Sequence, residues 1–134
     1  MLRRSSPQFT MPVDEEFKAL AKRYRRSPEF IGVELDDPNR TGMTGDTLLH
    51  AAVTRGSLND VRILIKSGAQ VSCIGDLGST PLHYAASRGH RDIALELLHA
   101  GADPSIKNEF GQTPLDLALL RKQASVTELL KTRG

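Results

Sequence analysis

Apolar residues along most of the chain recur at the spacing of amphipathic helices. In the first such segment the apolar residues that share one helical face are Val13, Phe17, Leu20, Ala21 and Tyr24. This spacing predicts a helix with Pro12 in its first turn. Ser27 and Pro28 then fit the N-cap and the first position of a short second helix that reaches Ile31.

Two shorter helices are predicted in the middle of the chain. Thr80 suits an N-cap, Pro81 the first helical position, and Gly89 a left-handed C-cap. Four apolar residues then fall on one face of a second helix that opens after His90 and ends at Gly101; they are Ile93, Ala94, Leu97 and Leu98. The pattern predicts an antiparallel helix pair, and the turn-rich residues 102–110 should project as a hairpin-like loop.

The helix-pair pattern is repeated in the sequence. The segment Gly45-Asp-Thr-Leu-Leu-His-Ala-Ala returns 33 residues later as Gly78-Ser-Thr-Pro-Leu-His-Tyr-Ala, and after the same interval as Gly111-Gln-Thr-Pro-Leu-Asp-Leu-Ala. A fixed period of this length indicates one structural unit copied in tandem, each copy burying its apolar face against a neighbour.

The repeats fit within one domain, because 134 residues leave no room for a second core. Residues 1–11 are rich in polar residues, Arg and Pro, so we expect a flexible segment whose deletion leaves thermal stability nearly unchanged. The predicted domain spans 12–134. Its parts are a degenerate N-terminal capping repeat (12–44), two full repeats (45–77 and 78–110) and a C-terminal capping repeat (111–134).

The middle copy resembles the ankyrin repeat in Thr80-Pro-Leu-His-Tyr-Ala-Ala, in Gly89-His90, and in Leu97-Leu98 followed by Gly101-Ala-Asp103. The resemblance implies an all-α solenoid of stacked helix pairs with protruding hairpin loops. It also implies a protein-binding scaffold that uses the loop tips and the exposed side of the first helices. Two departures from the motif are Leu48 in place of proline and Asp116 in place of histidine.

The composition of the chain limits the classes of partner that we expect. Lys and Arg total 18 against 16 Asp and Glu, a net charge of +2, which gives no strong reason to expect nucleic acid or an anionic membrane. No apolar run reaches membrane-spanning length, and the start does not resemble a secretory signal. Cys73 is the single cysteine, so a disulfide framework is excluded. We expect a cytoplasmic monomer.

Superposing the copies identifies candidate binding residues. Arg55, Arg88 and Arg121 share one repeat position near the end of each first helix, so we expect a row with a step of about 10 Å that favours an acidic partner. The alternative is a merely solvated position. The candidates at the loop tips are Met43, Asp76, Leu77, Glu109 and Phe110. Leu77 and Phe110 would be interface anchors, unless Phe110 folds down to seal the adjacent repeat.

The pattern of histidines predicts a structural role for them rather than a catalytic one. His50 and His83 occupy one repeat position, which indicates a task performed in every unit, such as hydrogen bonding across a helix cap. Catalysis would need a unique histidine paired with a nucleophile, and none is visible. His90 fits local structure, His99 an exposed position, and Cys73 a small buried residue. We therefore expect no enzyme, cofactor or metal.

Three functions follow. The first is a non-catalytic protein-binding module, and the resemblance to small bacterial ankyrin proteins suggests an immunity protein that neutralises a cognate toxin or enzyme. The second is an adaptor that joins two proteins and would use Arg3 to Ser6 as a short docking or modification site. The third is a nucleic-acid binder that would use the basic residues of the first helix, Lys18, Lys22, Arg23, Arg25 and Arg26. Nearby acidic residues such as Glu15 and Glu16 make this third function the least favoured.

Overall fold

Seven α-helices and two single-turn 3₁₀ helices follow one another in the computed structural model, which describes residues 10–133. They are α1 (Thr10–Tyr24), η3 (Pro28–Phe30), α2 (Leu48–Arg55), α3 (Leu58–Lys66), η4 (Asp76–Gly78), α4 (Pro81–Arg88), α5 (Arg91–His99), α6 (Pro114–Leu120) and α7 (Ala124–Arg133). Within this range the β-pairing is a single bridge between Thr41 and Thr47. The fold is all-α.

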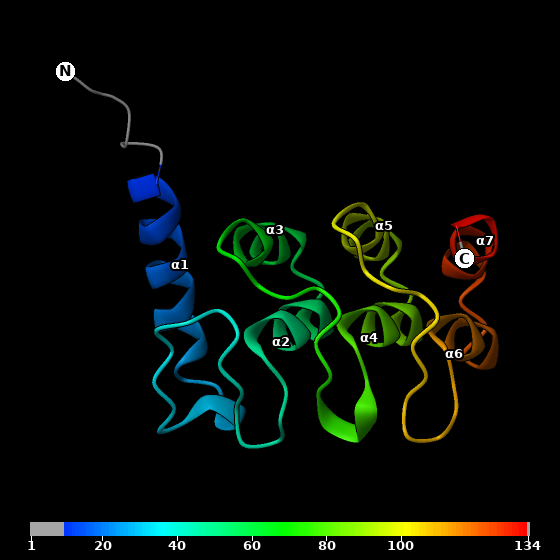
Figure 1. Ribbon diagram of the computed structural model, residues 1–134, viewed down its shortest axis with the longest axis horizontal. Helices are drawn as coiled ribbons and strands as arrows, with labels where there is room; N and C mark the ends of the chain where they lie inside the picture. Colours follow the sequence, from blue (N-terminus) through cyan, green and yellow to red (C-terminus); the bar gives the residue numbers. More distant parts are fainter. Residues whose placement is uncertain (1–9, 134) are drawn as a thin grey trace.

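The helices stack into a solenoid (Figure 1). The pairs α2–α3, α4–α5 and α6–α7 lie side by side, so that α2, α4 and α6 form one layer and α3, α5 and α7 form the other. The loops between repeats project beyond the first layer. Helix α1 closes the N-terminal end by packing against α3.

Each first helix begins at an equivalent threonine. The hydroxyl of Thr47, Thr80 or Thr113 accepts a hydrogen bond from the backbone N–H three residues later. The side chain of that later residue in turn accepts from the threonine N–H, which completes a capping box. Gly56 and Gly89 cap the C-terminal ends of α2 and α4, and their φ angles of 72° and 75° lie in the left-handed region that glycine adopts without strain.

The two repeated histidines connect neighbouring repeats. The Nε2–H of His50 donates to the carbonyl of Ser79 at 3.0 Å, and that of His83 donates to the carbonyl of Gln112 at 2.9 Å. Each Nδ1 accepts from the backbone N–H of its own N-cap threonine, so both rings are neutral. Burial lowers the pKa of both imidazoles. The structural interpretation of this repeat position is confirmed.

The third copy departs from this pattern. Asp116 takes the histidine position and still accepts from the Thr113 N–H at 3.0 Å, but its shorter side chain caps only its own helix. Lys122 takes the position of Gly56 and Gly89 and adopts a left-handed φ of 58°. Helix α6 therefore ends at Leu120, and Arg121 is its C-cap.

Small and branched residues form the interfaces between repeats. Val53 and Ala86 occupy one repeat position and are fully buried where the next helix pair stacks on them. Leu119 is their counterpart in the last copy, and 51% of its surface is exposed. The apolar interior thus extends from α1 to α7, and its last stacking face is open to solvent.

The N-terminal capping region differs from the sequence prediction in two details. Helix α1 starts at Thr10, so Thr10 and Met11 are helical, whereas the rest of the segment predicted to be flexible, residues 1–9, lies outside the described residues. Pro12 fits there because the first turn needs no N–H donor. The second helix is a 3₁₀ turn that ends at Phe30, before Ile31. Ser27 makes no capping hydrogen bond, because its hydroxyl accepts from Arg55.

The protruding loops are tight turns rather than paired strands. One hydrogen bond closes each loop, from Gly42 N–H to Asp46 C=O (2.8 Å), from Gly75 to Ser79 (2.8 Å), and from Asn108 to Gln112 (2.9 Å). The closing pairs recur with the repeat period. The loops therefore present their tip residues at equivalent places in successive repeats.

Candidate functional site

The three arginines of one repeat position come together in space. Arg55 and Arg88 end α2 and α4, and Arg121 caps α6. All three line a groove of about 470 Å³ that runs across the ends of the first helices. The other lining residues are Thr54, Ser87 and His90. Every lining residue is polar or cationic and none is acidic, so the groove is a concave, positively charged surface with several hydrogen-bond donors.

The groove contains two kinds of arginine. Within the described residues, the side chains of Arg88 and Arg121 form neither an ion pair nor a hydrogen bond. Both are exposed. Their guanidinium groups keep all their donors available for a carboxylate, which an arginine can hold through two parallel hydrogen bonds.

Arg55 is already engaged. Its guanidinium lies over the ring of Tyr24, 4.1 Å from the ring centre, and donates to the hydroxyl of Ser27. It also lies 3.9 Å from a carboxylate oxygen of Glu29, and 41% of the side chain is exposed. Stacking and ion pairing orient this guanidinium but occupy part of its binding capacity. Arg55 therefore connects the capping region to the groove and offers a weaker site than Arg88 or Arg121.

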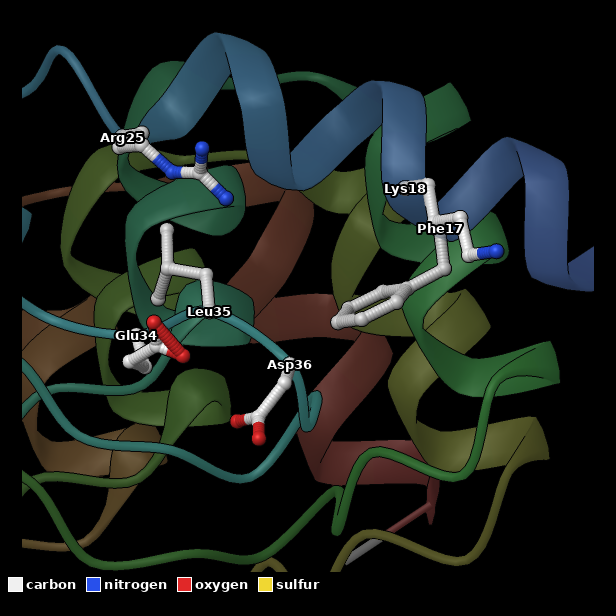
Figure 2. A pocket seen from close by; sticks show the side chains of 6 residues that line it. All are labelled: Phe17, Lys18, Arg25, Glu34, Leu35 and Asp36. Carbon is white, nitrogen blue, oxygen red and sulfur yellow. The ribbon is translucent and has the colours of Figure 1, made fainter.

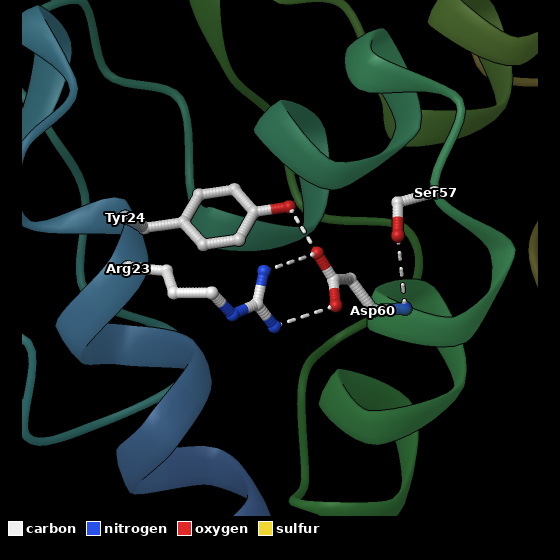
Figure 3. A network of polar contacts seen from close by, with 4 residues as sticks. All are labelled: Arg23, Tyr24, Ser57 and Asp60. Carbon is white, nitrogen blue, oxygen red and sulfur yellow. Dashed lines mark hydrogen bonds and ion pairs between the residues drawn. The ribbon is translucent and has the colours of Figure 1, made fainter.

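A buried carboxylate holds that capping region in place (Figure 3). Asp60, at the start of α3, accepts two hydrogen bonds from Arg23 (2.9 and 3.2 Å) and one from the Tyr24 hydroxyl (2.8 Å). Its backbone N–H donates to Ser57 Oγ. Burial alone would raise the pKa of Asp60, but hydrogen bonds from Arg23 and Tyr24 outweigh burial and lower it. The network fixes Tyr24, the ring on which Arg55 rests.

His90 has a packing role that the sequence reading missed. Its ring covers Gly56 of the preceding repeat so closely that a Cβ there would lie 3.0 Å from Cε1. Gln123 covers Gly89 in the same way and donates to the Ser87 carbonyl at 3.1 Å. These positions lie 33 residues apart, so the repeat period could have revealed the contact. Both contacts join neighbouring repeats, and the first of them brings His90 to the groove.

The predicted tip residues are exposed and lie on successive loops. Met43, Leu77 and Phe110 expose 77%, 50% and 67% of their surface. With this exposure, Phe110 does not fold down to seal the adjacent repeat. Asp76 and Glu109 are tied to neighbouring loops through their backbones, because Asp76 N–H donates to Asp46 and Glu109 N–H donates to the Leu77 carbonyl.

Leu77 has an unfavourable backbone conformation. Its φ of 57° lies in the left-handed region, where a side chain costs about 1–2 kcal/mol. Gly78, the next residue, is also left-handed, and a Cβ on it would meet the backbone of Glu109 at 3.0 Å. The turn thus presents an exposed leucine at a position where glycine or asparagine would be less strained. Such strain is often found at binding surfaces.

A second hollow lies at the N-terminal end (Figure 2). Phe17 and Lys18 of α1 and Arg25, just after its end, line one side of this cavity of about 330 Å³, and residues 34–36 line the other. Lys18 and Arg25 lie across from Glu34 and Asp36, so the two walls carry charges of opposite sign. Asp36 is itself paired with Arg40 at 2.7 Å. This mixed lining favours no ligand class.

The basic residues in α1 and just after its end do not act as one patch. Arg23 is used by Asp60, whereas Lys18, Lys22, Arg25 and Arg26 are exposed. No aromatic side chain is exposed among them, because the rings of Phe17 and Tyr24 are buried. Single-stranded nucleic acid is usually held by cations interleaved with exposed aromatic rings. The nucleic-acid alternative therefore gains no support here.

The remaining titratable residues form no recognisable reaction centre. Cys73 is half buried rather than fully buried, lies 3.9 Å from His50 Nδ1, and has a thiol pKa raised by burial. A raised pKa disfavours the thiolate that acts as a nucleophile. His99 is exposed and contacts Arg133. Among the described residues no cluster of three or more His, Cys, Asp or Glu is placed to hold a metal. No described helix has the length and apolarity needed to cross a membrane.

Comparison with known proteins agrees with this architecture. No curated protein matches the chain. The family model of ankyrin repeats in three copies matches residues 19–108, which run from the middle of α1 to the loop before α6. Proteins of this family generally act as protein-protein interaction modules and are typically non-catalytic. The match covers well over half of the chain, and the stacked helix pairs have the geometry that it requires, so the chain belongs to the ankyrin repeat family.

Proposed function

We propose that this chain binds one partner protein through the arginine groove and the loop tips, and that it acts by covering part of that partner. The observation that carries the proposal is the pair Arg88 and Arg121, which line one acid-free groove and have no ion-pair partner within the described residues. Unpaired guanidinium groups in a concave site favour a carboxylate-rich surface and accelerate its association.

The loop tips would supply the apolar part of the interface. Protein interfaces usually combine a few apolar anchors with a charged rim. Met43, Leu77 and Phe110 are the exposed apolar side chains of three successive loops, and Asp76 and Glu109 lie beside them. These two acidic residues would repel acidic surfaces of the partner from the tips. The acidic surface of the partner would therefore be directed to the arginine groove.

In its narrowest form, the proposal makes the chain a cytoplasmic immunity protein that occludes the active site of a cognate toxin or enzyme. The groove offers hydrogen-bond donors and positive charge for binding, so we expect an effect on the partner to come from occlusion. The adaptor alternative is supported by a different feature. The exposed cations of α1 lie outside the groove and could hold a second protein while the groove is occupied.

Affinity capture from native lysate tests the proposal. The double variant R88E/R121E reverses the two unpaired cations, and K66E/K131E reverses two exposed cations in the last turns of α3 and α7 with the same change in net charge. The expected result is a protein retained by wild type and by K66E/K131E and lost by R88E/R121E. Equal capture by all three chains would remove the groove from the function.

The identity of the captured protein distinguishes the immunity function from the adaptor function. A single enzyme whose activity is inhibited by wild type, but not by R88E/R121E, supports the immunity form. A ternary complex in which a second protein is lost on charge reversal of α1 supports the adaptor.

A further inference from the structure

The arginine groove restricts the conformation of its ligand as well as its charge, and this inference rests on the proposed function. We propose that the segment bound in the groove is an extended, left-handed polyproline II stretch with an acidic residue at every third position. Its carboxylates would pair with Arg88 and Arg121, with Arg55 as a weaker third partner.

The first argument is the spacing of the cations. Arg55, Arg88 and Arg121 occupy one repeat position on α2, α4 and α6, which pack side by side. Packed helices lie about 8–10 Å apart, which sets the step of the row. A polyproline II helix has three residues per turn and rises about 9.3 Å in that turn. Every third side chain therefore returns to the same face at the step of the repeats.

A β-strand does not match this step. Side chains on one face of a strand are about 6.6 Å apart, and the next one on that face is about 13 Å away. Strand addition would also need an exposed sheet edge. The described residues contain only one isolated bridge, between Thr41 and Thr47, so no such edge is available.

An α-helical ligand would match the spacing of the arginines but not the polar lining of the groove. Seven helical residues rise about 10.5 Å, so carboxylates seven residues apart would meet successive arginines. Helices that bind in grooves bury an apolar face, however, and need an apolar trough about 10 Å wide. The lining residues are Thr54, Arg55, Ser87, Arg88, His90 and Arg121, which provide no apolar side chain.

The same lining suits the backbone of an extended ligand. A polyproline II segment has no internal hydrogen bonds, so its carbonyl groups remain free to accept them. Thr54 and Ser87, which carry hydroxyl groups, stand immediately before Arg55 and Arg88 and line the same groove. The first two repeats thus pair a hydroxyl donor for a backbone carbonyl with a guanidinium for a carboxylate, whereas Leu120 precedes Arg121 in the third. A segment already in this conformation loses little entropy on binding.

Synthetic peptides test the spacing directly. The first probe consists of repeated Glu-Pro-Pro triplets. The second has the same composition and proline content, with its glutamates moved to alternating intervals of two and four residues. Both remain polyproline II, so only the register of charge differs. By fluorescence anisotropy at physiological salt, we expect the triplet peptide to bind at least about tenfold more tightly, because only its carboxylates meet successive arginines.

Variants of the groove arginines test whether the difference in affinity between the two peptides arises in the groove. R88Q/R121Q should remove the preference for triplet spacing, whereas K66Q/K131Q should keep it; thermal unfolding checks that both variants fold. Equal affinity for the two peptides overturns the inference. So does tighter binding of a helical peptide with glutamate at every seventh position or of oligothymidine. Should R88E/R121E still abolish capture of a partner protein while the peptides bind equally, the proposed function would stand and the polyproline II ligand alone would be excluded.

Discussion

Single residues in the third copy show where the repeat pattern is under strain. Lys122 occupies the position of Gly56 and Gly89 with a left-handed φ of 58°. We expect Lys122→Gly to raise the free energy of unfolding by about 1 kcal/mol, because glycine adopts this conformation without a steric penalty. Urea denaturation of the two chains measures the difference. Lower stability of the variant would contradict the expected relief of strain.

A glycine substitution at Leu77 should have opposite effects on the stability of the chain and on its binding to a partner. Leu77→Gly removes a left-handed leucine with a φ of 57°, so we expect a gain of about 1 kcal/mol in stability. It also removes an exposed apolar anchor, so capture of the partner should weaken. Urea denaturation and affinity capture of the same preparation measure both effects. Unchanged capture would mean that Leu77 is not part of the interface.

The buried histidines make stability depend on pH. Burial lowers the pKa of His50 and His83 below the ordinary value of 6.5. Below about pH 6.5 the unfolded chain therefore binds protons that the folded chain does not, and stability is lost as the pH falls towards the folded pKa values. We expect the urea midpoint to decrease between about pH 7.5 and about pH 5. The pKa of Asp60 is lowered from 3.8, so its contribution is lost only in more acidic solution. A constant midpoint would contradict protonation of the two rings on unfolding.

At the scale of elements, the sequence predicted the regular repeats far better than the capping region. Thr80, Pro81 and Gly89 correctly delimited α4, because capping and backbone preferences act over a few residues. The role of Arg55 was missed, since its contacts with Tyr24 and Ser27 join segments about 30 residues apart in a region without a clear repeat. The arginine row was correctly placed along one groove, but nothing in the sequence showed that its members differ.

The docking of α1 on α3 depends on one carboxylate. Asp60 is 7% exposed and accepts three hydrogen bonds from Arg23 and Tyr24. We expect Asp60→Asn to lower stability by about 2 kcal/mol, because the variant keeps the shape but loses the charge that these donors face. Arg62→Ala breaks the more exposed pair with Glu96 and should change stability by less than about 0.5 kcal/mol. Equal effects of the two variants in urea denaturation would contradict a special role of Asp60.

At the scale of the whole molecule, the capping region and the groove are coupled through Arg55. Arg55→Gln should lower both the melting temperature and partner capture, because it removes the contacts with Tyr24, Ser27 and Glu29 as well as a groove cation. Arg88→Gln should weaken capture and leave the melting temperature nearly unchanged. Thermal unfolding beside affinity capture distinguishes the two. If Arg55→Gln unfolded at the wild-type temperature, the coupling would be excluded.

The unequal engagement of the three arginines has an evolutionary consequence. A lineage that acquires a new partner can replace Arg88 and Arg121 freely, since neither supports another part of the molecule within the described residues. Arg55 has two roles, binding in the groove and holding the capping region. The second role persists whichever partner is bound, because the guanidinium stacks on Tyr24. Among descendants with different partners, we expect Arg55 and Tyr24 to persist together while the other two positions diversify.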